Sequence, residues 1–206
     1  MKISVIYPNY NCCDLTVRAL NSIEKRKDIE IIIIDDCSDD GSYEKVLEWS
    51  ELNKDYYGNI VVLRNEERKG SGYSFNRVIN DATGEYIIIL NNDDFFMMPL
   101  SYFYKYLDGT DMIYYNLFGN LEIYELNEET KSIRVGATKF IRREFIGETR
   151  KEEIMYYSDL KFYKQLQEKQ PTEIFTNEIL YYYNYPREGS LMNIANKNKI
   201  RYDGDD

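Results

Sequence analysis

The sequence predicts an α/β fold in which a mostly parallel sheet is flanked by helices. Its most informative stretch is IIIIDDCSDDGS, from Ile31 to Ser42, where four consecutive isoleucines run directly into two aspartates. A strand that is apolar at every position is typical of a sheet that is buried on both faces. As far as Leu90, apolar strand-length runs alternate with segments of helical spacing. This strand–helix–strand order favours a parallel, doubly wound sheet.

The expected elements of this first part follow in order along the chain. Strands are expected at 3–7, ending at Pro8, and at 31–34, 60–63 and 86–90. Helices are expected where core-facing residues recur at i, i+3 and i+4. The first helix has this spacing at Thr16, Ala19, Leu20 and Ile23, and the second, capped by Ser42, has it at Tyr43, Val46 and Leu47. The third has it at Phe75, Val78, Ile79 and Ala82 and is expected to end at Gly84. Such a sheet binds its ligands beyond the carboxyl ends of the strands.

After Leu90 the pattern changes to a more mixed region. A helix is expected from Pro99 to Leu107, and Met112–Leu117 and Leu121–Tyr124 are expected to form a hairpin. The remaining expectations are a strand at 133–135, a short basic helix or loop at 138–145, a helix at 159–167, a strand at 179–183 and a short helix at 190–196. With no internal repeat and no long linker, the chain is expected to form a single domain.

Composition narrows the classes of function. The 206 residues are 43% hydrophobic and 30% charged, which is typical of a soluble globular domain. A net charge of −10 argues against binding to a nucleic acid backbone. The absence of histidine excludes imidazole chemistry, and three cysteines without a CxxC pair indicate reduced thiols and a cytoplasmic protein. No stretch reaches membrane-spanning length, and the N-terminus is interpreted as a strand rather than a signal peptide.

Two pairs of acids follow strands of the predicted sheet. Asp35 and Asp36 follow the isoleucine strand, and Asp93 and Asp94 follow the fourth strand. Because parallel strands end at one edge of the sheet, the pairs are expected to lie together, where carboxylates suit Mg²⁺ or Mn²⁺ shared with nucleotide phosphates. The loop Lys69–Gly72 could add backbone N–H groups at a helix N-terminus. The alternative is that these acids only form turns and favour helix starts.

Together these segments resemble glycosyltransferase family 2. The resemblance runs from Ile3 to about Asn193 and is carried by SVIYPNYN, IIIIDDCSDDGS, NRVINDATGEY and LNNDDFFMMP, and later by TKFIRREFIG, SDLKF and LYYYNYPREGSLMN. It implies a single GT-A type, Rossmann-like domain over residues 1–206. Residues 1–98 would bind the nucleotide sugar, and a smaller mixed region, 99–206, would bind the acceptor.

The resemblance also implies roles for individual residues. Asp36 matches the carboxylate that reads the base, usually uracil, and Asp159 matches the general base. The implied metal ligands for Mn²⁺ or Mg²⁺ are Asp93 and Asp94. The implied nucleotide contacts are Pro8, Tyr10, Asp36, Lys69, Asn76, Asp93 and Arg187, with Ser190 in the segment that closes near the diphosphate.

The family's reaction would be an inverting transfer from a nucleotide sugar, with UDP as the expected nucleotide. The acceptor would be the hydroxyl of a glycan, a lipid-linked glycan or a protein, and peripheral membrane contact through that acceptor is an open alternative to a purely cytoplasmic location. Three positions depart from the family pattern, because Asn91 and Ser158 replace acids and Phe75 replaces an arginine. Asp159 could instead be a helix-start residue. A sugar nucleotidyltransferase and a non-catalytic nucleotide-sugar-binding module are the alternative functions.

Overall fold

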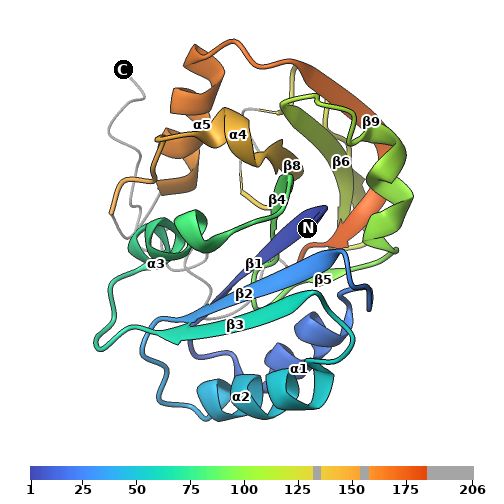
Figure 1. Cartoon of the computed structure of the whole chain (residues 1–206). Coiled ribbons are helices and arrows are strands. Elements are labelled where there is room, and N and C mark those ends of the chain that lie inside the picture. Colours follow the sequence, from blue (N-terminus) through green and yellow to red (C-terminus); the bar gives the residue numbers. More distant parts are fainter. Residues whose placement is uncertain (132–135, 154–157, 185–206) are drawn as a thin grey trace.

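The computed structural model describes residues 1–131, 136–153 and 158–184, and within them nine strands form one sheet (Figure 1). The strand order is β3-β2-β1-β4-β8-β6-β9-β5, with β7 paired to β6. The strands are β1 (Ile3–Asn9), β2 (Ile29–Asp35), β3 (Asn59–Arg64), β4 (Tyr86–Ile89), β5 (Phe95–Phe96), β6 (Met112–Gly119), β7 (Glu122–Tyr124), β8 (Lys139–Arg142) and β9 (Glu173–Tyr182).

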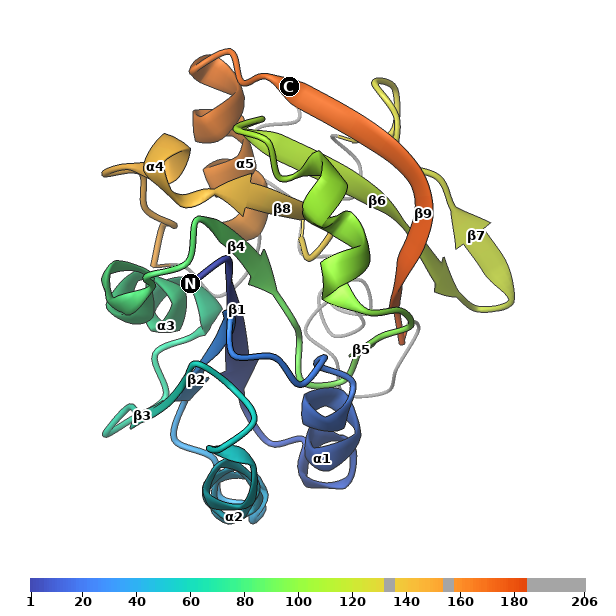
Figure 2. The same ribbon diagram turned by 45° about the vertical axis from the view of Figure 1, so that its right-hand side comes forward.

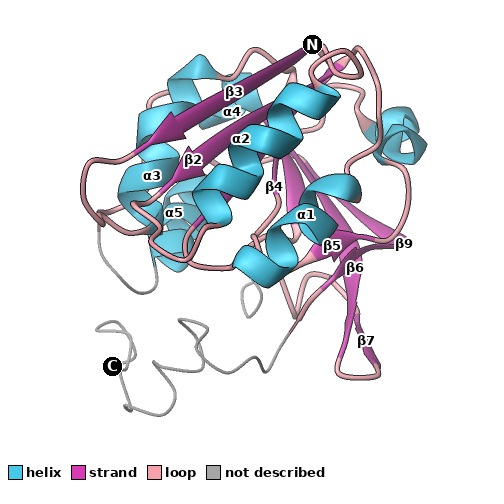
Figure 3. Ribbon diagram, turned by 90° about the horizontal axis from the view of Figure 1, so that it is seen from below, coloured by secondary structure: helices cyan, strands magenta, loops and turns pink. Residues whose placement is uncertain are grey.

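Helices cover both faces of this sheet. They are α1 (Cys13–Asn21), α2 (Ser42–Asn53), α3 (Ser71–Val78), α4 (Arg143–Ile146) and α5 (Ser158–Glu168), with 3-10 helices η1 (Ile79–Asp81) and η2 (Leu100–Tyr106). Figure 3 shows α1 and α2 together over one face, with α3 and α5 behind the strands. All seven residues of β2 are therefore buried, because this strand lies between β1 and β3 and is covered from both sides. The predicted α/β fold is confirmed.

The parallel part of the sheet sets the position of the predicted site. Strands β1, β2, β3 and β4 run parallel, and β1 pairs with β2 as far as Asn9 opposite Asp35. Strand β1 was predicted to end at Pro8, but Pro8 lies within it. Pairing with β4 stops at Ile6 opposite Ile89, so the missing N–H of Pro8 costs no bond on that side.

The strands after β4 continue the same sheet, but they run in both directions. Strand β8 is antiparallel to both β4 and β6, and β6 is parallel to β9 (Figure 2). The carboxyl ends of β4, β6 and β9 therefore share one edge. A basic helix or loop was predicted at 138–145. This was wrong for residues 139–142, which form β8, and the short helix α4 follows them. Lys139, Phe140 and Ile141 are buried, since neighbouring strands fix a segment that is too short to show a local pattern.

Other expectations were confirmed or corrected in detail. The hairpin at 112–124 is formed by β6 and β7, the helix after Pro99 is the 3-10 helix η2, and β9 is longer than the predicted 179–183. The predicted strand at 133–135 and helix at 190–196 lie outside the described residues. Within the described residues, no helix has both the length and the apolar character needed to cross a bilayer.

Two helix ends differ from the prediction. Ser42 begins α2 instead of capping it, and its N–H is held by the Asp40 carboxylate at 3.0 Å. Helix α2 buries Val46 and leaves Leu47 42% exposed. Gly84 does not end α3, which gives way to η1 after Val78. A Cβ on Gly84 would lie 2.5 Å from the backbone N of Ser4, so glycine is required there by close approach.

Candidate active site

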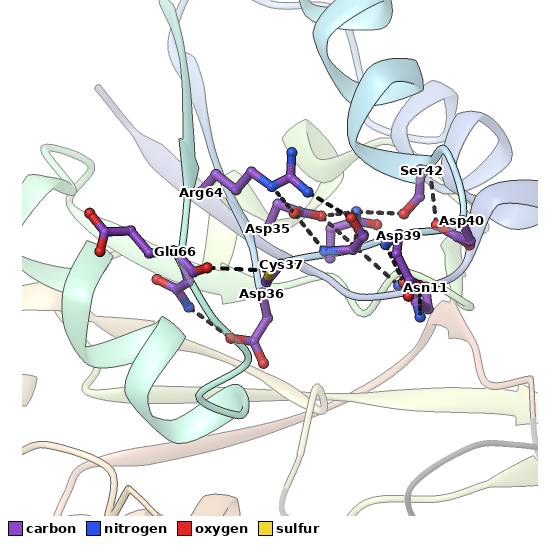
Figure 4. Close-up of polar contacts among 12 residues, drawn as sticks. Asn11, Asp35, Asp36, Cys37, Asp39, Asp40, Ser42, Arg64 and Glu66 are labelled. Carbon is purple, nitrogen blue, oxygen red and sulfur yellow. Dashed lines mark hydrogen bonds and ion pairs between the residues drawn. The ribbon is translucent and has the colours of Figure 1, made fainter.

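A buried polar network shapes the turn that follows β2 (Figure 4). Asp35 is fully buried, and its carboxylate accepts hydrogen bonds from Asn9 Nδ2 at 2.7 Å and from the Ser38 hydroxyl at 2.6 Å. The Ser38 N–H donates at 3.0 Å, and Arg64 Nε lies 3.3 Å away as an ion pair. Asp35 is thus saturated by protein groups, and its role is to hold the ends of β1, β2 and β3 together.

Asp36 faces a different set of groups. Its Oδ1 accepts hydrogen bonds from Asn65 Nδ2 and from the N–H of Lys69, each at 2.8 Å, and its Oδ2 accepts one from the N–H of Gly70 at 2.7 Å. Asp36 is 6% exposed. A carboxylate has about four acceptor positions, so Oδ2 retains one for a ligand. Asp36 therefore ties the start of α3 to the end of β2 and keeps capacity for one further donor.

The loop 66–70 contributes charge as well as backbone. Lys69 donates its N–H to Asp36, while its ammonium pairs with Glu67 at 2.5 Å and points into solvent. The Arg68 guanidinium lies 4.2 Å from the centroid of the Tyr10 ring. The Tyr10 carbonyl accepts a hydrogen bond from Asn92 Nδ2 at 3.0 Å. The turn after β1, the loop after β3 and the tip of β4 are thereby joined at one edge of the sheet.

The two acids after β4 differ sharply in environment. Asp94 is 1% exposed, and its carboxylate is held by the Tyr181 hydroxyl at 2.8 Å and by the Asn184 N–H at 2.8 Å. Burial, and then the neighbouring charge of Asp93, raise the pKa of Asp94 to about 7. Asp93 is more accessible, and Arg18 donates to its carbonyl at 2.7 Å.

Asn91, which replaces an acid of the family pattern, has a structural function here. Its Nδ2 donates to Asp94 Oδ2 at 3.1 Å. An aspartate at position 91 would lose this donor and place another negative charge beside a buried carboxylate. Asparagine at position 91 is therefore compatible with a buried Asp94 carboxylate.

The described residues have no group of three or more acidic, cysteine or histidine side chains arranged around a common metal position. Asp93 and Asp94 nevertheless fit a hard cation, because Mg²⁺ and Mn²⁺ sites of this type use one or two carboxylates and complete their shell with substrate phosphates and water. Asp93 is the more accessible of the two carboxylates, and Asp94 would have to be ionised to bind a cation.

Asp159 is the second residue of α5, which lies on the same face of the sheet as α3. Helices α3 and α5 pack together, with the Phe75 and Phe162 rings 5.3 Å apart, and Phe75 is a core residue as predicted. A Cβ on Gly72 would lie 3.3 Å from Ser158 Cβ. The start of α3, which binds Asp36, therefore adjoins the start of α5.

Asp159 also lines a cavity of about 20 Å³, room for roughly one water molecule. Lys139 and Lys151 line it too, and the other walls are mainly apolar. Reading the sequence alone missed both lysines; the only signal was a lysine inside the apolar segment TKFI.

Of the remaining residues predicted to contact the nucleotide, Asn76 and Pro8 are among the described residues. Asn76 binds the backbone of Lys151: its amide oxygen accepts from the Lys151 N–H at 2.9 Å, and its amide nitrogen donates to the Lys151 carbonyl at 2.7 Å. It anchors the segment after α4, and its predicted nucleotide contact stays a prediction. Pro8 is the last but one residue of β1 and pairs with Ile34 near the end of β2. Arg187 and Ser190 lie outside the described residues.

Comparison with known proteins agrees with this arrangement. The chain is 33% identical over 97 residues to the UDP-Glc:alpha-D-GlcNAc-diphosphoundecaprenol beta-1,3-glucosyltransferase WfaP of Escherichia coli, a match that covers 46% of this chain and 36% of that protein. It resembles S. aureus TarS 1-349 in complex with UDP-GlcNAc (TM-score 0.78, 21% identity, 94% of this chain and 61% of that one). It also resembles the mannosyltransferase PcManGT of Pyrobaculum calidifontis in complex with GDP-Man and Mn²⁺ (TM-score 0.73, 18% identity, 91% and 58%).

The chain spans only part of these proteins, and its matches cover 29%, 15% and 37% of three further curated relatives. The structural likeness, at about one residue in five identical, establishes the fold. The decisive finding is the match of a family model, described as glycosyl transferase family 2, to residues 4–169. Because this match covers most of the chain and includes Asp36, Asp93, Asp94 and Asp159, the protein belongs to glycosyl transferase family 2.

Proposed function

We propose that the protein transfers a sugar from a UDP-linked nucleotide sugar to an acceptor hydroxyl, as in the assembly of a polysaccharide or another glycan. The observation that carries this proposal is the Asp36 carboxylate, which is fixed by the N–H groups of Lys69 and Gly70 and keeps one acceptor position. The names of WfaP and of the TarS complex, which contain UDP-Glc and UDP-GlcNAc, support the choice of nucleotide.

In this proposal the nucleotide lies across the ends of β1, β2 and β4. Asp36 accepts the uracil N–H, and the Tyr10 ring with the Arg68 guanidinium offers an aromatic and cationic surface beside the base. Either Lys69, once its ammonium leaves the ion pair with Glu67, or Arg187 offsets the charge that grows on the departing diphosphate. A bound Mn²⁺ or Mg²⁺ would be held by Asp93 and Asp94 and would supply positive charge to the diphosphate.

The acceptor half supplies the base. Asp159 takes the proton from the acceptor hydroxyl as that oxygen attacks the anomeric carbon and the bond to the diphosphate breaks. A single displacement of this kind inverts the anomeric configuration. No second carboxylate nucleophile is needed.

Asn91 and Ser158 favour one competing function, a nucleotide-sugar-binding module without catalysis, because both replace acids. Incubating the protein with UDP-sugars, a mixture of glycan acceptors and Mn²⁺ separates the two. Release of UDP that depends on acceptor supports transfer, whereas binding without turnover supports the module.

Asp36→Ala should abolish the preference for UDP over ADP and GDP, because the side chain that accepts the uracil N–H is lost. Calorimetry with the three diphosphates should show the tightest binding for UDP in the wild type. Asp39→Ala, an exposed change in the same turn, is the control and should keep this preference. Equal affinity of the wild type for all three nucleotides would contradict the assignment.

Mn²⁺ should strengthen UDP binding, and this gain should decrease as the pH falls through about 7. The cause is the pKa of Asp94, raised to about 7 by burial and by Asp93: below that pH the carboxyl holds its proton and loses a ligand position. UDP titrations at pH 6 and pH 8, with Mn²⁺ and with EDTA, measure the effect. A Mn²⁺ gain that survives both Asp93→Asn and Asp94→Asn would place the cation elsewhere.

A further inference from the structure

Two lysines lie in the interior between the sheet and α5. Lys139 of β8 is 4% exposed, and its Nζ donates to the Thr138 hydroxyl at 3.0 Å. This Nζ also lies 5.3 Å from the centroid of the Tyr163 ring and 5.5 Å from that of Tyr114. Lys151 is half-buried, with its Nζ 4.7 Å from the centroid of the Phe75 ring. Ammonium groups in such surroundings are costly unless an opposite charge faces them.

Asp159 supplies that opposite charge. It lines the same small cavity as both lysines, among walls that include Ile89, Ile141 and Phe162. Burial lowers the pKa of Lys139 to about 7, with the charge of Lys151 adding to this and the charges of Asp159 and Glu173 opposing it. Burial also lowers the pKa of Lys151, and Asp159 again opposes the shift.

The backbone at the start of α5 and Gly136 both lie close to the Asp159 carboxylate. The Leu160 N–H donates to its Oδ1 at 3.1 Å, and a Cβ on Gly136 would lie 3.2 Å from its Oδ2. Among the described residues, the titratable groups near Lys139 include Tyr114 of β6, Asp159 and Tyr163 of α5, Glu173 of β9, and Lys151 of the segment after α4. Strand β4 contributes Ile89 to the cavity wall, and the Phe75 ring of α3 lies against Lys151.

We propose that Lys139 and Lys151 are positioning residues for Asp159: across the small cavity that all three line, their positive charges keep the carboxylate at the start of α5 in the orientation that receives the acceptor proton. This inference rests on the proposed transfer reaction. The lysines act through Asp159 and are not required for nucleotide binding, because Asp36, Asp93 and Asp94 lie at the ends of other strands. Asn76 supports the arrangement by fixing the backbone of Lys151 through two hydrogen bonds.

A titration that needs no activity tests the electrostatic interaction between Lys139 and Asp159. In protein labelled with carbon-13 at lysine Cε, the Lys139 signal is identified by its loss in Lys139→Met, and its midpoint in the wild type should lie near 7. Asp159→Asn should lower that midpoint by roughly one unit, since an opposite charge is removed. Lys151→Met should raise it, since a like charge is removed. A Lys139 midpoint that is the same in the wild type and in Asp159→Asn would overturn the proposal.

Kinetics test the positioning. Lys139→Met should lower kcat roughly tenfold and leave UDP affinity within about twofold, and in the Asp159→Asn background the same change should cause no further loss. A purely structural lysine would lower the rate by the same factor in both backgrounds, which would overturn the inference. Lys161→Met is the matched control on α5, because its ammonium pairs with Glu152 at 2.7 Å, and it should leave kcat unchanged.

The two levels of the proposal can fail separately. If the wild type transfers no sugar to any acceptor, the proposed function is wrong, and the titration still decides whether Asp159 and Lys139 interact. If the wild type transfers sugar and Lys139→Met retains full kcat, the proposed function stands and the positioning role is wrong. Lys151→Met, at the half-buried position, repeats the kinetic test without removing the buried lysine of β8.

Discussion

Replacing Asp159 by asparagine is expected to lower the rate of sugar transfer by about 10²–10⁴, the usual contribution of a general base. An acceptor hydroxyl is a poor nucleophile unless its proton leaves as the new bond forms. The chain has no histidine, so a carboxylate is the natural base, and Asp159 lies at the start of α5 and not among the acids at the ends of β2 and β4. UDP affinity should therefore change by less than about twofold.

The measurement is the initial rate of UDP release with saturating donor, together with the affinity for UDP by calorimetry. Asp159→Glu should restore part of the rate, because it returns a carboxylate to the same place. Glu168→Gln removes an exposed carboxylate at the other end of α5 and is the matched control. Near wild-type transfer by Asp159→Asn would show that Asp159 is a helix-start residue and a charge partner of Lys139, without a role as a base.

The first four strands could be predicted because their information is local. Each is an apolar run bounded by turn residues, and the isoleucines of β2 are buried on both faces as their uniform hydrophobicity indicates. Strand β8 could not be predicted in the same way. Its four residues include Lys139 and Arg142, and they become a strand because β4 and β6 flank them on both sides. Only the tertiary fold contains that information.

In the candidate site, too, some features follow from the local sequence and others only from the tertiary fold. Strand direction predicts that acids after β2 and β4 share an edge, and the structure places them there. The environment of each acid depends on distant residues: Asp94 is held by Tyr181 and Asn184, which lie 87 and 90 residues later in the chain. A pattern read along the sequence cannot show such a contact. It therefore could not predict that Asp94 is buried or that Lys139 and Lys151 line the same cavity as Asp159.

Asp35, the last residue of β2, and Asp36, which follows it, illustrate how position at the end of a strand decides the role of a residue. Successive side chains of a strand point to opposite faces. Asp35 is directed to the network of Asn9, Ser38 and Arg64, and Asp36 to the N–H groups of Lys69 and Gly70. One acid can therefore be fully used by the fold while the next retains capacity for a ligand.

Asp35→Ala is consequently expected to be among the most destabilising single substitutions in the chain. It would leave the Ser38 N–H and Asn9 Nδ2 without their buried acceptor and would remove the ionic partner of Arg64. Breaking a buried charged network costs about 3–5 kcal/mol, a large part of the stability of an ordinary domain, which is about 5–15 kcal/mol. The free energy of unfolding from urea denaturation measures this loss.

A control substitution at the exposed Asp39 distinguishes the contribution of the Asp35 network from that of the turn. Asp39→Ala removes a carboxylate from the same turn, where it is hydrogen-bonded to Asn11 at 2.8 Å and lies at the surface, so its cost should stay below about 1 kcal/mol. Asp35→Ala should also weaken UDP binding, because the backbone of Asp36 continues directly from the network, whereas Asp39→Ala should not. Equal effects of the two substitutions on unfolding would show that the network of Asp35 contributes little to the stability of the strand ends.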